Sequence, residues 1–278
     1  MKPSNSSIRM ANGQPHQARK RFGQNFLHDQ GVIQRIIDAI DPQAGDHLVE
    51  IGPGQGALTN PLAQFDAKLD CIELDRDLAA HLQQHYQNNE TVQVYQHDIL
   101  KFDLEDLLGD NQGTGQLRII GNLPYNISTP VIFHLLKKHH LIKDMIFMLQ
   151  LEVVQRLAAK VGEKNYGRLG LMTQYFCDIQ HLFNVPSAAF TPQPKVSSAI
   201  VRLVPHSTLP VAAKNIETLQ TVIRTAFNQR RKTLKNSLKT IISEDKLQEL
   251  AIDLGQRPEK LALADFVAIS DVISAQGT

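Results

Sequence analysis

Hydrophobic residues recur at helical spacing early in the chain. Residues 32–40 place five of them on one face, namely Val32, Ile33, Ile36, Ile37 and Ile40. This period predicts an amphipathic helix. The next apolar run, at residues 47–52, is short and ends in a glycine-rich segment, which is typical of a buried strand.

The same alternation of apolar runs and helical patterns continues to residue 150. Further strands are predicted at 69–74, 92–96, 117–122 and 145–150, and helices at 57–65, 76–86, 103–108 and 129–139. Strand and helix repeating at this pitch predict right-handed crossovers and a mostly parallel sheet that is covered on both faces. Two later runs, at 179–185 and 196–204, predict strands that join this sheet in the antiparallel direction.

The strand pattern ends near residue 207. Helical patterns follow at 215–227, 231–242, 245–254 and 264–275, and they are separated by breakers such as Gly255 and Pro258. The sequence therefore predicts a flexible basic N-terminal arm at 1–18, an α/β Rossmann-like domain at 19–206 and a small all-helical C-terminal domain at 207–278.

The charge of the chain is strongly polarised, although its net value at pH 7 is only +1. Residues 1–24 carry five basic residues and no acid, and residues 224–239 carry six basic residues and no acid. By contrast, residues 41–110 carry 14 acidic and 3 basic residues. Two basic blocks are typical of a protein that binds a polyanion, and an acidic segment suits a cationic ligand.

The composition excludes several classes of protein. Of the 278 residues, 42% are hydrophobic and 21% charged, which excludes a wholly disordered, collagen-like or coiled-coil chain. Without a long apolar run or a signal peptide, we expect a cytoplasmic protein with no membrane partner. Cys71 and Cys177 are expected to be reduced core thiols. The adjacent His139 and His140 cannot share a helical face, and no metal site is expected.

A glycine-rich segment follows the first predicted strand. Gly52 and Gly54 allow the backbone to approach a ligand closely and to turn sharply into a helix. With Ala57 they match the loose dinucleotide fingerprint, and Glu73 after the next strand is placed to hold ribose hydroxyls. On this motif alone, an NAD site and a simple strand-to-helix turn without a ligand both stay open.

Acidic residues follow several of the predicted parallel strands. Asp98 comes after the strand at 92–96, and the C-terminal ends of parallel strands meet at one edge of a sheet. Its carboxylate can accept a hydrogen bond from an adenine amine, while Glu50 and Glu73 add negative charge suited to a sulfonium ion. A pyrophosphate is disfavoured there, so the sequence favours S-adenosylmethionine over NAD. The expected fold class is a class I S-adenosylmethionine-dependent methyltransferase.

The fourth strand of the series ends in the motif GNLPYNIS at 121–128. If the Asn122 side-chain oxygen and the Leu123 carbonyl accept the two hydrogens of an adenine amine, its lone pair can point at a methyl group. Pro124 stiffens the turn, and Tyr125 is expected to stack on the base through its ring face, so that Tyr125→Phe changes little. An ordinary β-turn is the alternative interpretation.

Six ordered motifs resemble those of the ribosomal RNA adenine dimethyltransferases. They are RFGQNFL at 21–27, VEIGPGQG at 49–56, ELDR at 73–76, GNLPYNIS at 121–128, YGRLG at 166–170 and FTPQPKV at 190–196. The resemblance covers about residues 17–242. It is closest to the bacterial enzymes that dimethylate two adjacent adenosines in the 3′-terminal hairpin loop of 16S ribosomal RNA.

The resemblance also implies a set of site residues and a partner. The implied cofactor contacts are Asn25, Leu27, Gly52, Glu73, Asp98 and Asn122. The glycine loop adds Gly54 as a further candidate contact. Residues 122–125 would receive the adenine, and Phe190 would pack on its other face. The implied partner is 16S ribosomal RNA within the small ribosomal subunit, and we expect the enzyme to be monomeric. Residues 243–278 match no motif of the family.

Basic residues near the start of the second predicted C-terminal segment are candidates for RNA contacts, and they are Arg230, Arg231, Lys232, Lys235 and Lys239. In a helix, Arg231, Lys235 and Lys239 would share one face at a spacing of four residues and would contact phosphates. A solvated basic helix is the alternative interpretation. Lys195 and Arg202 flank Phe190 and are further candidates to hold RNA near the pocket.

Four other functions compete with this interpretation. Methylation of adenine in DNA or of a glutamine amide in protein would use a similar turn, but the basic arm and the full motif series favour RNA. A resistance methyltransferase acting on large-subunit RNA is the closest enzymatic alternative. An assembly factor that binds an immature ribosomal subunit is an alternative of another class, and both roles can coexist in one protein.

Overall fold

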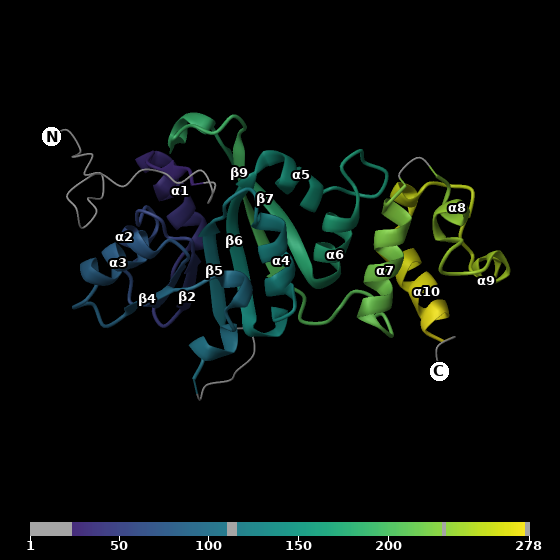
Figure 1. Ribbon diagram of the computed structural model, residues 1–278, viewed down its shortest axis with the longest axis horizontal. Helices are drawn as coiled ribbons and strands as arrows, with labels where there is room; N and C mark the ends of the chain where they lie inside the picture. The colour runs from purple at the N-terminus through teal and green to yellow at the C-terminus, as the bar shows by residue number, and fades with distance from the viewer. Residues whose placement is uncertain (1–23, 110–115, 230–231, 276–278) are drawn as a thin grey trace. The chain divides into compact units, whose positions relative to one another are not determined.

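The computed structural model describes residues 24–109, 116–229 and 232–275 (Figure 1). The chain divides into two compact units. The first contains residues 1–154 and 180–205, and the second contains residues 155–179 and 206–278. Within the described residues, no helix is long and apolar enough to cross a membrane.

A seven-stranded sheet is the main β structure. Its strands in chain order are β2 (His47–Ile51), β3 (Lys68–Glu73), β4 (Val92–Gln96), β5 (Leu117–Asn122), β6 (Ile142–Gln150), β7 (Cys177–Val185) and β9 (Ser198–Pro205). Their spatial order is β4-β3-β2-β5-β6-β9-β7. The pairings from β4 to β6 are parallel and β9 is antiparallel to β6. The prediction of a mostly parallel sheet with an antiparallel addition is thus confirmed.

The strand order gives the sheet a topological switch point. The chain runs outward from β2 to β4 and then returns to place β5 on the other side of β2. In open α/β sheets, ligands bind beyond the C-terminal ends of the strands at such a point. The ends of β2 and β5 therefore define where a binding site is expected.

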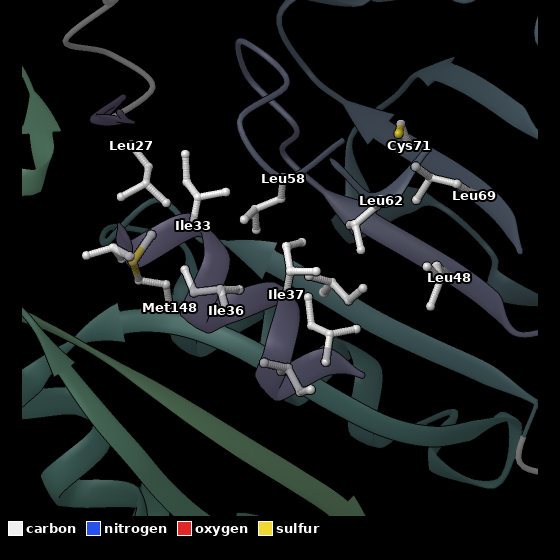
Figure 2. Close-up of a cluster of buried hydrophobic side chains, with 14 of the residues drawn as sticks. Leu27, Ile33, Ile36, Ile37, Leu48, Leu58, Leu62, Leu69, Cys71 and Met148 are labelled. Carbon is white, nitrogen blue, oxygen red and sulfur yellow. The ribbon is translucent and has the colours of Figure 1, made fainter. Parts of the chain in front are cut away.

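The helix α1 (Gln30–Ile40) covers part of one sheet face. Asp29 caps it, because its carboxylate accepts a hydrogen bond from the Val32 amide at 3.0 Å. Its apolar face is buried, and Figure 2 shows Ile33, Ile36 and Ile37 among side chains of the strands. Residues of α2 (Thr59–Leu62) and α3 (Arg76–His85) belong to the same hydrophobic cluster. The helix predicted at 32–40 is confirmed.

Several connections differ from the sequence-based expectation. The helix predicted at 57–65 is only the four residues of α2, and the helix predicted at 103–108 is a 3₁₀ turn, η3 (Leu104–Leu107). A second 3₁₀ turn, η2 (Ile99–Lys101), precedes it. Aspartates cap both turns through their own side chains, which favours short turns over a continuous helix. The helix predicted at 129–139 is present as α4 (Ser128–Leu136).

The sequence patterns did not predict some short elements. These are β1 (Phe26–Leu27) and β8 (Phe190–Thr191), which form a two-stranded antiparallel sheet, the helices α5 (Leu151–Leu157) and α6 (Arg168–Phe176), and the 3₁₀ turns η4 (His139–Leu141) and η5 (Ser187–Ala189). Two-residue strands carry no periodicity, so nothing in the local sequence indicates that β1 and β8 pair.

The second unit is helical. Besides α6 it contains α7 (Ile216–Phe227), α8 (Leu234–Leu238), α9 (Glu244–Gln248), the 3₁₀ turn η6 (Pro258–Lys260) and α10 (Leu263–Ser274). Residues 155–179, which the sequence placed in the first domain, belong to this unit. The Tyr166 hydroxyl donates to the Leu261 carbonyl at 2.9 Å, and the Gly162 amide donates to Glu259 at 2.7 Å. These bonds tie the segment to the C-terminal helices.

Candidate active site

A cavity of about 350 Å³ lies at the C-terminal ends of the parallel strands. This volume is in the range of small-molecule sites. The lining comes from the ends of β2, β3, β4 and β5 and from the segment before α1. It includes every predicted cofactor residue and all four residues predicted to receive adenine: Asn25, Leu27, Gly52, Gly54, Glu73, Asp98, Asn122, Leu123, Pro124 and Tyr125. The topology of the sheet brings these distant residues together.

The glycine loop at the cavity is hydrogen-bonded to the side chain of Glu73. Gly52 and Gly54 have positive φ angles of 67° and 58°, which side chains other than glycine rarely adopt. The Gly54 amide donates to Glu73 Oε2 at 3.0 Å, and the Asp75 amide donates to Oε1 at 2.8 Å. Burial raises the pKa of Glu73, although these backbone bonds act in the opposite direction. The loop is therefore tied to the carboxyl group that ends β3.

The described lining of the cavity is acidic. Glu50 is 2% exposed and accepts a hydrogen bond from the Thr59 hydroxyl at 2.7 Å. Burial raises the pKa of Glu50 to about 7, and the neighbouring Glu73 adds to the shift. The Asp98 carboxylate accepts from the Leu100 amide at 3.0 Å, which fixes it at the end of β4. No lysine or arginine is among the described lining residues, so the cavity favours a cationic ligand.

The segment before α1 forms one wall of the cavity. Leu27 pairs with Phe190 across β1 and β8, and the Gln24 side chain donates to Asp75 Oδ2 at 3.2 Å. Gln24 and Phe26 also line the cavity, although no role was predicted for them from the sequence. Asn25 and Leu27 were implied only by the family motif. No local signal could have found these four residues, because their contacts are with residues far along the chain, such as Asp75, Asn122 and Phe190.

The Asn122 amide has a defined orientation. Its Nδ2 donates a hydrogen bond to the backbone carbonyl of Asn25 at 3.1 Å. Because one end of the amide is committed as a donor, the Oδ1 end is the acceptor that a ligand can use. The Pro124 carbonyl accepts from the amides of Ile127 and Ser128, both at 3.1 Å, and this turn leads into α4. The motif is thus a turn, and it is also the part of the cavity wall with an oriented acceptor.

Three of the predicted residues do not line the cavity. Phe190 is 3% exposed, belongs to the hydrophobic core and is not among the lining residues, so its contact with a base stays a prediction. Lys195 is exposed in the loop between β8 and β9. The Arg202 guanidinium pairs with Asp144 at 2.6 Å, which lowers the charge that it offers to phosphates. Its contact with RNA stays a prediction.

The predicted basic face of the C-terminal region is only partly present. Arg230 and Arg231 lie outside the described residues. Lys232, Lys235 and Lys239 are exposed, but α8 has five residues, so the helix predicted at 231–242 does not extend along this face. The Lys235 ammonium forms an ion pair with Glu244, which lowers the charge available to phosphates. The RNA contacts therefore stay a prediction.

Metal-binding clusters are absent from the part of the chain that the structure describes. No group of three or more histidine, cysteine, aspartate or glutamate side chains there could hold a metal ion. Cys71 and Cys177 are buried and unbridged, and burial raises the pKa of both thiols. Among the described lining residues, the groups available for chemistry are the carboxylates, the oriented Asn122 amide, the His97 imidazole and the Tyr125 ring.

Comparisons with known proteins agree with this arrangement. The family model for ribosomal RNA adenine dimethylases matches residues 15–275. The protein named ribosomal RNA small subunit methyltransferase A of Marinobacter nauticus is 55% identical over 268 residues, which cover 96% of this chain and 96% of that protein. The Pseudomonas fluorescens protein of the same name is 54% identical over 261 residues, covering 94% and 95%.

Solved structures show the same fold. A dimethyladenosine transferase from Plasmodium falciparum matches with a TM-score of 0.73 and 25% identity, covering 91% of this chain and 98% of that chain. The 23S rRNA methyltransferase ErmE matches with a TM-score of 0.67 and 22% identity, covering 90% and 100%. The predicted Rossmann-like methyltransferase fold is thus confirmed. The chain belongs to the ribosomal RNA adenine dimethylase family.

Proposed function

We propose that this protein transfers methyl groups from S-adenosylmethionine to the exocyclic amines of two adjacent adenosines in the 3′-terminal hairpin loop of 16S ribosomal RNA. The observation that carries the proposal is the Asn122 amide, which is oriented by Asn25 and lies in the same cavity as Glu50 and Glu73. An acceptor for an amine thus lies beside acids suited to a methylsulfonium cofactor. Acting on an assembling small subunit, the enzyme would work in the cytoplasm.

The cavity fits S-adenosylmethionine, the cofactor of this enzyme. Glu50, Glu73 and Asp98 line it without a described basic partner, which suits a ligand that carries a sulfonium cation and an ammonium group. The turn at Gly52 and Gly54 lets the backbone lie close to the ligand. When bound, the cofactor supplies an electrophilic methyl group. A pyrophosphate would face the same carboxylates and be repelled, so NAD does not fit.

The residues of β5 and its following turn act on the adenine. Asn122 Oδ1 and the Leu123 carbonyl accept hydrogen bonds from the two amine hydrogens, which turns the nitrogen lone pair toward the methyl group. The Tyr125 ring stacks on the base and holds its plane. Attack requires no activated serine, cysteine or histidine, because the amine releases its extra proton after the bond to carbon forms. Catalysis on this scheme is mainly positioning.

The choice of subunit rests on the relatives. Those at 53 to 55% identity carry the name small subunit methyltransferase A, whereas the 23S enzyme shares 22% identity and shows the fold alone. We therefore place the substrate in the small ribosomal subunit. Basic residues that include Lys195, Lys232 and Lys239 are exposed and contribute contacts to RNA phosphates. Such contacts position a substrate and do not select its bases.

A methylation assay tests this proposal directly. Labelled S-adenosylmethionine is incubated with the protein and with separately purified small or large subunits, and the modified bases are mapped. We expect label only in small-subunit RNA, at two adjacent adenosines, and no binding of NAD by calorimetry. Label in large-subunit RNA would assign the protein to the resistance class. Stable binding to small subunits without label would favour the assembly-factor alternative.

Glu50 makes cofactor binding depend on pH. Its pKa is raised to about 7 by burial, so the carboxyl group is mostly neutral below that pH and charged above it. A cationic ligand favours the charged form, and lowering the pH from 8 to 6 is expected to weaken S-adenosylmethionine binding about three- to tenfold. Calorimetry across this range measures the change. S-adenosylhomocysteine, which lacks the sulfonium charge, should show a smaller dependence.

A variant separates Glu50 from other titrating groups. Glu50→Gln removes the carboxyl group that titrates in this range. The variant is expected to bind at pH 8 as weakly as the wild type does at pH 6, with a flatter profile. An unchanged profile in Glu50→Gln would show that the pH dependence does not come from Glu50.

A further inference from the structure

The hydroxyl group of Tyr125 has a specific partner on a distant strand. It lies 2.7 Å from the hydroxyl of Ser198, which is 73 residues further along the chain. Ser198 is the first residue of β9 and is 0% exposed. A pair of hydroxyl groups at this distance forms a hydrogen bond, and either oxygen can be the donor.

Both partners of this bond are held in place by other contacts. Ser198 lies opposite Gln150 in the pairing of β9 with β6, and the Leu151 amide donates to the Ser197 carbonyl at 3.0 Å. The Ser128 hydroxyl donates to the Tyr125 carbonyl at 3.3 Å. The tyrosine is thus fixed at its backbone by the turn and at the far end of its ring by the sheet. Its ring has one fixed orientation at the cavity wall.

We infer that Ser198 is a positioning residue, which sets the angle of the Tyr125 ring and through it the plane of the adenine during methyl transfer. The inference rests on the proposed function. Nothing in the family motifs selects Ser198, since it follows the last of them at 190–196. Burial also raises the pKa of Tyr125, which keeps its hydroxyl protonated and able to bond to Ser198.

This bond changes what is expected of the tyrosine hydroxyl. The sequence predicts that the ring face alone holds the base and that Tyr125→Phe changes little. In the structure the ring is half-buried, and its hydroxyl bond is the contact that joins it to β9. Phenylalanine would keep the stacking face but lose this bond, so that packing alone would hold the ring angle. A misplacement of about 1 Å at a reacting atom can lower a rate on the order of a hundredfold.

A double-mutant cycle tests the inference. The variants are Ser198→Ala, Tyr125→Phe and the double variant, and the readouts are the single-turnover rate of methyl transfer to small subunits and the affinity for S-adenosylmethionine. Each single variant is expected to lower the rate about tenfold with unchanged cofactor affinity. Because both remove the same bond, the double variant should be no slower than either single variant.

Matched controls separate positioning from folding. Ser270→Ala also removes the hydroxyl of a serine that is 0% exposed, in α10, and should leave the rate unchanged. Wild-type rates in both single variants, or rate losses that multiply in the double variant, would overturn the inference. If Ser198→Ala fails to fold, Tyr125→Phe still tests the inference, because a wild-type rate in Tyr125→Phe would exclude a role for the bond. Absence of methyl transfer by the wild type would instead refute the proposed function.

Discussion

Asn122→Ala is expected to fold normally, to bind small subunits, and to transfer methyl groups at a rate lower by a hundredfold or more, on the order of the loss from misplacing a reacting atom by about 1 Å. The reason is that the side chain provides the acceptor end of an oriented amide, and the partner of that acceptor is an adenine flipped into the cavity. In the free protein the substitution removes one hydrogen bond, to the Asn25 carbonyl at 3.1 Å. Single-turnover incorporation of label measures the rate.

The control for this experiment distinguishes a role of Asn122 in methyl transfer from a role that is limited to the structure of the turn. Asn184→Ala removes an exposed asparagine amide that bonds to His181, outside the cavity, and should behave as the wild type. Melting temperatures of both variants report on folding. A lowered melting temperature in Asn122→Ala, with normal methyl transfer by the folded protein, would assign the motif to the turn alone.

The sequence predicted those parts of the site that follow from the direction of the strands. Periodicity placed two strands at 92–96 and 117–122, and the structure has β4 and β5 with these same bounds. Once the sheet is known to be parallel, residues that follow its strands must meet at one edge. Glu73, Asp98 and Asn122 therefore share a cavity, as expected.

The remaining features depend on contacts between residues far apart in the chain. The bond from Tyr125 to Ser198 crosses from a turn to an antiparallel strand, and the pairing of Leu27 with Phe190 involves two-residue strands. Neither leaves a periodic signal. Charge counts were also misleading locally, because Lys235 pairs with an acid that lies nine residues away and outside the basic block. Net charge of a segment does not show which of its charges are already neutralised.

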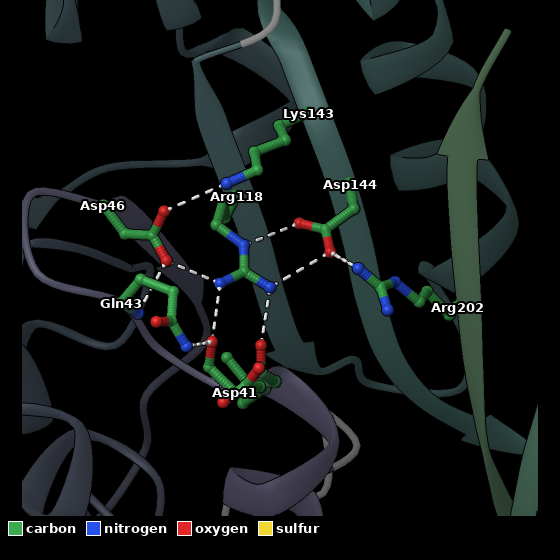
Figure 3. A network of polar contacts seen from close by, with 8 residues as sticks. Asp41, Gln43, Asp46, Arg118, Lys143, Asp144 and Arg202 are labelled. Atoms are coloured by element: carbon green, nitrogen blue, oxygen red, sulfur yellow. Dashed lines mark hydrogen bonds and ion pairs between the residues drawn. The ribbon is translucent and has the colours of Figure 1, made fainter.

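A buried arginine connects the first helix to the sheet. It and its partners do not line the cavity. Figure 3 shows the Arg118 guanidinium between Asp46 and Asp144. It donates to Asp144 at 2.9 and 3.1 Å and to Asp46 at 2.6 Å, and its side chain is 5% exposed. It also donates to the carbonyls of Ile40 and Asp41, the last residue and the C-cap of α1. Arg118 thus satisfies carbonyl groups that every helix end leaves without partners.

Arg118→Ala is expected to lower the free energy of unfolding by about 3 to 5 kcal/mol, because removing the buried cation leaves Asp46 and Asp144 paired with more exposed cations that compensate their charges less well. Asp144 is 2% exposed and would keep only Arg202, and two carbonyls of α1 would lose their donor. Urea unfolding followed by circular dichroism measures the change. The cofactor residues are untouched, so folded protein at low temperature should still bind S-adenosylmethionine.

Lys143→Ala is the matched control, because it removes a cation from the same network at its exposed edge. The Lys143 side chain is 53% exposed and lies 3.2 Å from Asp46, so its loss is expected to change the free energy of unfolding by at most about 1 kcal/mol.

Burial alone would raise the pKa of Asp46, but the Gln43 amide and Arg118 together lower it below its ordinary value of 3.8. The stabilisation from this pair is therefore present above pH 3.8 and is lost as the pH falls through the lowered pKa. If Arg118→Ala and Lys143→Ala unfolded at the same urea concentration at pH 7, the buried guanidinium would contribute no more than a surface charge.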